Sequence, residues 1–155
     1  MTPPDAWYAT LTPRWHAGNS APWLARSGDT VGAHGARMAV LARRLWADAS
    51  PALIWACIAH DLGEMATGDA PLTAKSDPEL KATLNRLEVK ALADMGIVIA
   101  LSRLDRDRLK YLDRLDAYLW AGLHAPHLLD RDEWRQAKTW LDAQQVLLCG
   151  VVRAK

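Results

Sequence analysis

Apolar residues recur at helical spacing through most of the chain, and Pro, Gly, Asn and Ser separate the periodic segments. The apolar run over 96–101 has no partner run with which to form a sheet, so we interpret it as a buried connector. The stretches 14–28 and 68–75 are interpreted as loops. The pattern therefore predicts an all-α fold. The predicted helices span 5–12, 29–47, 51 through His60 and Asp61, 76–95, 105–123 and 131–148.

A single histidine lies on the apolar face of the helix predicted over 29–47. His34 shares one stripe with Val31 and Met38, and the arginines of this helix mostly turn away from it. A lone histidine in such a place is more often a hydrogen-bonded core residue than a metal ligand. Its meaning therefore depends on what the neighbouring helix offers.

The neighbouring helix is opened by Ser50-Pro51, a capping residue followed by Pro at the first helical position. Ile54 and Ile58 belong to its predicted apolar stripe, and the segment stays apolar until His60 and Asp61. Two such groups at the end of an apolar helix cost desolvation free energy unless a metal ion or a hydrogen-bonded partner holds them. This position is typical of a functional site.

More polar groups follow soon after. Glu64 comes four residues after His60, so a continued helix would place both on one face. Asp69 and Lys75 lie in the loop that begins at Gly68. The alternative interpretation is a helix end that faces water, with Asp69 capping the turn.

Length and composition limit the class of protein. The chain has 155 residues, which predicts one domain over 1–155. It has no apolar run of membrane-spanning length, and its start lacks the layout of a signal peptide. With two cysteines, one of them in an apolar helix, no disulfide framework is expected, and a cytoplasmic location fits. The net charge of +1 argues against a broad nucleic-acid-binding surface, so any phosphate binding must be local.

Six short motifs follow one another in order. They are Arg14-Trp15, Val31-Gly-Ala-His34, His60-Asp61-Leu-Gly-Glu64, Gly68-Asp69-Ala-Pro71, Lys75 and Lys110-Tyr-Leu-Asp113. In this order they resemble the motifs of the HD-domain phosphohydrolases. The resemblance is closer to the nucleotide-cleaving branch, which includes bacterial 5'-deoxynucleotidases and compact phage dATP triphosphohydrolases. It covers about residues 14–120. Where the family usually has Glu-His-Ser, this chain has Ala33-His34-Gly35, so the residues that support the ligand differ.

The resemblance implies a compact HD-domain bundle of about six helices around a single metal site. Its ligands would be His34, His60, Asp61 and Asp113. Helical spacing alone leaves Asp113 and Asp116 both able to face the metal, and the resemblance selects Asp113, which leaves Asp116 a supporting or surface role. Two imidazoles and two carboxylates suit one divalent ion, with Co, Mn, Mg, Zn, Ni and Fe all conceivable.

The resemblance also implies roles for the remaining motif residues. Glu64 would be the catalytic acid or base, and Arg14 and Lys75 would bind phosphate. Trp15 would hold the base and sugar, and Asp69 the sugar or phosphates. The alternative for Arg14 is an ion pair with a carboxylate in an anchored loop.

Three histidines have no assigned role. They are His16, His124 and His127. The last two flank Pro126 and could hold a second metal, as in some cyclic-nucleotide phosphodiesterases with the HD fold. They lack a nearby carboxylate, so we interpret them as loop residues.

The expected function is a metal-dependent deoxynucleotide phosphohydrolase, and the substrate is a small-molecule nucleotide. The small size, the Arg-Trp-His start and the ungapped spacing from His60 to Asp113 resemble the phage enzymes, which implies a dNTP triphosphohydrolase, in the host-cell cytoplasm if a phage encodes it. A 5'-deoxynucleotidase acting on dNMPs is the alternative. Two hypotheses of another class are a non-catalytic nucleotide sensor and a helical interaction module with incidental His and Asp residues. Base preference, metal identity and oligomeric state, a homo-oligomer included, stay open.

Overall fold

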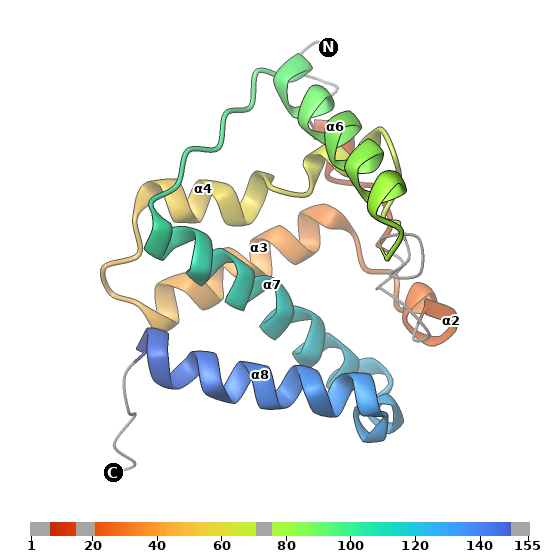
Figure 1. Ribbon diagram of the computed structural model, residues 1–155, viewed down its shortest axis with the longest axis vertical. Helices are drawn as coiled ribbons and strands as arrows, with labels where there is room; N and C mark the ends of the chain where they lie inside the picture. Colours follow the sequence, from red (N-terminus) through yellow and green to blue (C-terminus); the bar gives the residue numbers. More distant parts are fainter. Residues whose placement is uncertain (1–6, 15–20, 71–75, 150–155) are drawn as a thin grey trace. The chain divides into compact units, whose positions relative to one another are not determined.

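Helices make up nearly all the regular structure in the computed structural model, which describes residues 7–14, 21–70 and 76–149. Within these ranges there is no strand, only an isolated bridge that pairs Pro13 with Thr30. The prediction of an all-α fold is therefore confirmed (Figure 1). The α-helices are α2 (Ala21–Leu24), α3 (Val31–Leu45), α4 (Pro51–Ala59), α6 (Pro78–Asp94), α7 (Arg103–His124) and α8 (Asp132–Cys149), and the 3₁₀ helices are η2 (Ala25–Ser27), η3 (Leu62–Met65) and η4 (Pro126–Asp130). Among the described residues, no helix has the length and apolar character needed to cross a membrane.

The chain divides into two compact units, each with its own apolar core. The first comprises Met1–Ala36 and Ile58–Ala100, and the second comprises Arg37–Cys57 and Leu101–Lys155. Helices α3 and α4 each contribute residues to both. The core of the first unit contains Ala9, Val31, Ala59 and Leu62, with Met65, Leu92, Met95, Ile97 and Ile99 packed against them. The fully buried residues in the core of the second unit include Met38, Ala42, Leu53, Cys57 and Leu112.

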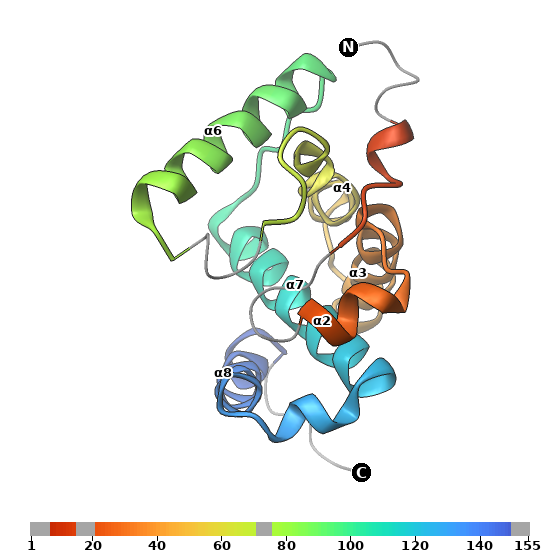
Figure 2. The same cartoon turned by 90° about the vertical axis from the view of Figure 1, so that its right-hand side faces the viewer.

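In the first unit, α6 packs against η3, the turn that follows α4 (Figure 2). Gly63 makes this approach possible, because a Cβ atom there would lie 2.5 Å from the backbone oxygen of Glu88. Helix α6 begins at Pro78, and the side chain of Asp77 accepts hydrogen bonds from the backbone nitrogens of its first turn. Helix α6 therefore begins two residues after the predicted start at 76, because the carboxylate of Asp77 supplies the capping acceptor. The predicted end is confirmed, since Gly96 has a φ of 71°.

In the second unit, α7 packs against α8 and η4, and Figure 1 shows α8 alongside α7. Ser50 caps α4, as predicted, by accepting a hydrogen bond from Leu53 N at 3.0 Å. The same hydroxyl donates to Asp105 in the first turn of α7 at 2.9 Å. Buried Cys57 has a pKa raised to about 12, because desolvation disfavours the thiolate. Cys57 and Cys149 form no disulfide in the described part of the chain, as the composition predicted.

Helix α4 differs from its prediction in length and orientation. It ends at Ala59, so His60 and Asp61 lie in the turn that follows it rather than within a continuing helix. Ile58 is exposed and Ile54 only half-buried, whereas the neighbouring Leu53 is fully buried. Almost every side chain in α4 is apolar, so periodicity could not select the buried face.

Three smaller expectations also need correction. The stretch 14–28, predicted as a loop, contains α2 and η2, where Leu24 is fully buried and supplies an apolar anchor. The connector over 96–101 is not buried throughout, because Val98 is exposed while its neighbours pack on the core. Helical spacing from Leu112 and Leu115 predicts Leu119 on the inner side of α7, but Leu119 is half exposed.

Candidate metal centre

The first turn of α3 holds His34, which is fully buried as predicted. Its backbone nitrogen donates to Thr30 O at 2.9 Å, and the Thr30 hydroxyl accepts from Ala33 N at 3.2 Å. Thr30 is therefore the capping residue of α3. Gly32 is required here, because a Cβ atom would lie 2.7 Å from the side chain of Thr10. These contacts fix the turn that carries the His34 imidazole.

Asp61 lies close to two imidazoles. Its Oδ1 is 3.2 Å from Nε2 of His60, and its Oδ2 is 3.6 Å from Nε2 of His34. The two imidazole rings have centroids 5.5 Å apart. Because Asp61 comes just after the C-terminal end of α4, its carboxylate adds negative charge where the helix dipole is already negative. This arrangement favours a cation.

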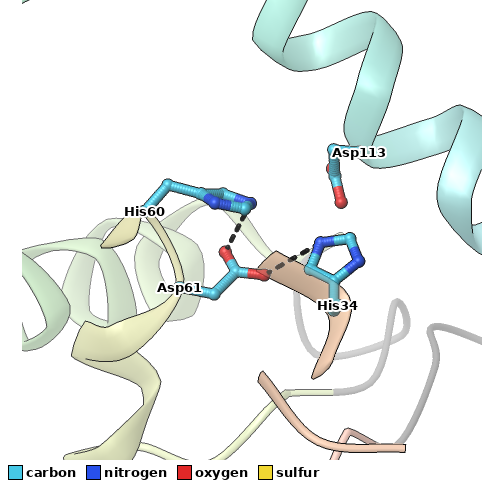
Figure 3. A group of neighbouring side chains, drawn as sticks. All are labelled: His34, His60, Asp61 and Asp113. Carbon is cyan, nitrogen blue, oxygen red and sulfur yellow. Dashed lines mark ion pairs between the residues drawn. The ribbon is translucent and has the colours of Figure 1, made fainter. Parts of the chain in front are cut away.

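Asp113, in α7, completes a group of four possible metal ligands (Figure 3). One donor atom from each of His34, His60, Asp61 and Asp113 lies within 4.8 Å of all the others. Ligand bonds of about 2.0–2.2 Å place donor atoms about 3–4.4 Å apart around one ion. The spacing is close to this requirement, and the donors are imidazole and carboxylate groups, so the four residues fit a divalent cation. In the described ranges this is the one group of three or more His, Cys, Asp or Glu residues with such spacing.

Asp116, the other candidate on α7, has a different partner. Its carboxylate accepts hydrogen bonds from Nε of Arg37 at 2.7 Å and from Nη2 of the same residue at 2.8 Å. It is buried, and it is not among the four possible ligands. The apolar stripe of α3 predicts that its arginines mostly turn away from the buried face, yet Arg37 pairs with buried Asp116. The signal that could have identified the pair is spacing, since Arg37 follows His34, and Asp116 follows Asp113, by three residues.

Glu64 and Asp69 are both buried on the segment after the His60-Asp61 pair. Glu64 belongs to η3, and its backbone nitrogen donates to Asp61 O at 2.9 Å. The segment from His60 to Glu64 is a turn followed by a 3₁₀ helix. His60 and Glu64 therefore do not share the face of one continuous α-helix. A tight turn of fixed hydrogen bonding instead ties Glu64 to Asp61.

Arg14 forms an ion pair with a carboxylate, which was the alternative interpretation of this residue. Its Nη1 lies 3.7 Å from Oδ2 of Asp29, and its backbone nitrogen donates to Asp29 O at 3.1 Å. Both side chains are largely buried, so the loop is anchored at this point. Trp15, His16 and Lys75 lie outside the described residues.

The two histidines near Pro126 do not form a second site with metal-ligand spacing in the part of the chain that the structure describes. His124 stacks on Trp120, with ring centroids 4.0 Å apart, and His127 lies in η4.

Comparison of the chain with protein-family models, curated proteins and solved structures gave no match. The residues of this chain form a helical fold with a His/Asp cluster that could bind a metal ion.

Proposed function

We propose that this chain is a metal-dependent deoxynucleotide phosphohydrolase of the HD type. The observation that carries the proposal is the group of four possible ligands, in which a His, a His-Asp pair and an Asp from three separate segments come within 4.8 Å of one another. These are the residues and the order that the motif resemblance implies. An incidental set of surface residues would have little reason to converge, or to include the fully buried His34.

The metal site would be formed by His34, His60, Asp61 and Asp113. When bound, a divalent ion supplies electrostatic stabilisation of a phosphoryl oxygen and makes water more acidic. The donor set does not select among Mn²⁺, Co²⁺, Fe²⁺, Ni²⁺, Mg²⁺ and Zn²⁺. The carboxylate of Asp61 lies beside Nε2 of both imidazoles, so the three side chains could donate to the same ion.

Glu64 is the proposed acid or base. It is buried and fixed by the turn that begins at Asp61. Its place in the turn that follows the His60-Asp61 pair suits a group that moves a proton during turnover. Glu64 would accept a proton from the attacking water and return it to the leaving 5' oxygen of the nucleoside. A bond from water to the α-phosphorus would form as the bond to the 5' oxygen breaks.

Binding of the phosphates would fall to Arg14 and Lys75, and binding of the base and sugar to Trp15 and Asp69. Arg14 is held by Asp29, and a guanidinium group has donors enough to contact a carboxylate and a phosphate together. The ion pair would therefore orient Arg14 rather than prevent it from binding substrate.

The favoured substrate is a dNTP, hydrolysed in one step to deoxynucleoside and intact triphosphate. A single ion allows one phosphorus beside it, and a base held near that ion would place the α-phosphorus there. A dNMP, cleaved to deoxynucleoside and phosphate by the same chemistry, is the alternative substrate.

Product analysis tests this proposal. The purified protein would be treated with a chelator, reloaded with each divalent ion in turn, and incubated with dNTPs, dNMPs and ribonucleotides. We expect metal-dependent release of deoxynucleoside, with triphosphate as the other product from a dNTP. Accumulation of dNDP or dNMP would contradict the proposed orientation. Nucleotide binding without turnover by any metal-loaded form would instead indicate the sensor, and neither binding nor turnover would indicate the interaction module.

A further inference from the structure

Arg37 and Asp116 join α3 to α7 through a bidentate ion pair. Two parallel hydrogen bonds of 2.7 and 2.8 Å run from the guanidinium group to the two carboxylate oxygens. The side chain of Asp116 is 3% exposed and that of Arg37 is 28% exposed. Two-point pairing of planar groups fixes their relative orientation as well as their distance.

A second contact with α7 holds the same guanidinium group. The Cζ atom of Arg37 lies 4.1 Å from the centroid of the Trp120 ring. Asp116 and Trp120 are four residues apart, so they lie on neighbouring turns of one face of α7. Arg37 is therefore fixed at its edge by a carboxylate and at its face by an aromatic ring, both from the same helix.

The position of this pair relates it to the candidate ligands. Arg37 lies three residues after His34 on α3, and Asp116 lies three residues after Asp113 on α7. Residues three apart on a helix share a face. The ion pair thus fixes both helices at the turn next to the one that presents a ligand. Both oxygens of Asp116 accept hydrogen bonds from Arg37, which argues against Asp116 as a ligand itself.

We propose that Arg37 and Asp116 form a positioning pair that holds His34 and Asp113 at the spacing needed to bind one divalent ion. The proposal rests on the metal site proposed above. Supporting residues that orient metal ligands commonly contribute 10- to 100-fold in metal affinity. Because Arg37 and Asp116 act through the helix backbone, an effect of about tenfold is expected.

Substitutions of opposite charge distinguish a positioning role of the pair from a direct electrostatic effect on the bound ion. Removing the negative Asp116 near a cation would weaken metal binding through charge alone, and removing the positive Arg37 would strengthen it. A positioning pair predicts the same direction for both, since either change breaks the same connection. Arg37→Met and Asp116→Asn should therefore each weaken metal binding.

The chain offers a matched control in Arg108. This arginine also donates to a carboxylate, that of Asp48, at 3.1 Å, and its Cζ lies 4.8 Å from the ring centroid of Trp46. It lies on α7 five residues before Asp113, not on the adjoining turn. Arg108→Met should lower stability and leave metal affinity unchanged.

The experiment is calorimetric titration of the purified full chain and its variants with Mn²⁺ and Co²⁺, with folding checked by circular dichroism. We expect Arg37→Met and Asp116→Asn to raise the Kd for the ion by about tenfold. The charge-neutral double variant Arg37→Met/Asp116→Leu provides a test that leaves no buried charge without a counterpart, and it should weaken binding likewise.

Two kinds of failure can be told apart. If the unmodified chain binds neither ion, the proposed metal site is wrong and the positioning pair with it. If the unmodified chain binds an ion, but Arg37→Met tightens binding or the double variant binds as tightly as the unmodified chain, the metal site stands and the positioning role is wrong. Equal weakening by Arg108→Met would also contradict it, because the effect would then come from general loss of stability.

Discussion

The two ends of α4 carry polar groups of different kinds. At its start, Ser50 contacts Asp105, and Arg108 lies close to Asp105 and Asp48, so donors, acceptors and charges of both signs occur together. At its other end, the candidate ligands are imidazoles and carboxylates. The first group contains its own cation, and the second is a set of electron-pair donors.

This difference shows how a structural polar cluster can be distinguished from a candidate metal site. Buried carboxylates are tolerated when a cation or hydrogen-bond donors accompany them. Around Asp105 the protein supplies both. Around Asp61 the close groups are two histidines, which become good metal ligands in their neutral form. A divalent ion would complete the second cluster and would have no place in the first.

The largest expected difference comes from making the same Asp→Asn substitution in the polar cluster at each end of α4. Asp61→Asn should weaken metal binding by more than about 100-fold, since loss of a ligand exceeds the usual effect of losing a supporting contact. Activity should then fall to background. Asp105→Asn should lower the melting temperature without changing the Kd for the ion. Calorimetry and thermal unfolding measure the two effects, and a similar Kd for both variants would remove the distinction between the clusters.

The next effect concerns proton transfer rather than metal binding. Glu64→Gln should keep the fold and the metal while lowering kcat by about 10²–10⁴-fold, the usual contribution of one positioned acid or base. Glu88→Gln is the matched control, because Glu88 lies on α6 in the same unit and accepts a hydrogen bond from Thr67 at 3.2 Å. Steady-state kinetics with metal-loaded protein would measure kcat for both variants. Near-normal turnover in Glu64→Gln would leave Glu64 a structural residue.

A smaller effect should follow from disturbing the turn that carries the ligands. Gly63→Ala would place a Cβ atom 2.5 Å from the backbone oxygen of Glu88, so α6 or η3 must shift, at a cost of about 1–3 kcal/mol in unfolding free energy. Metal affinity should fall as well, because Gly63 lies two residues from Asp61. Gly122→Ala is the control, since its Cβ would lie 3.4 Å from one side-chain atom of Leu129. Denaturant unfolding of the two variants would show whether close packing at Gly63 matters.

The smallest expected effect lies at the start of α4. Ser50→Ala removes the cap on the helix and a hydrogen bond to Asp105, which should cost about 1 kcal/mol of stability. The Kd for the ion should not change, because this end of α4 contains no candidate ligand. Thermal unfolding with and without Mn²⁺ measures both quantities. A change in metal affinity would mean that the two ends of α4 are coupled through the helix.

The sequence by itself determined the helical class and most helix positions. Helices α3, α7 and α8 begin and end within about two residues of the predicted bounds, because apolar periodicity and capping residues are local signals. The burial of His34 was also predicted from its stripe and is confirmed. The identity of the four possible ligands came from the order of the motifs, not from periodicity. The assignment to the HD family, the substrate and the catalytic roles remain predictions.

The tertiary structure decided what local pattern could not. The apolar composition of α4 gave no signal for its buried face, and packing selected Leu53 over Ile54 and Ile58. The choice between Asp113 and Asp116 was equally open to helical spacing, since both lie on one face of α7. In the structure Asp113 lies with the other candidate ligands, whereas both oxygens of Asp116 accept hydrogen bonds from Arg37, 79 positions away in sequence. Contacts between distant segments, which no local period encodes, separate a structural carboxylate from a candidate ligand.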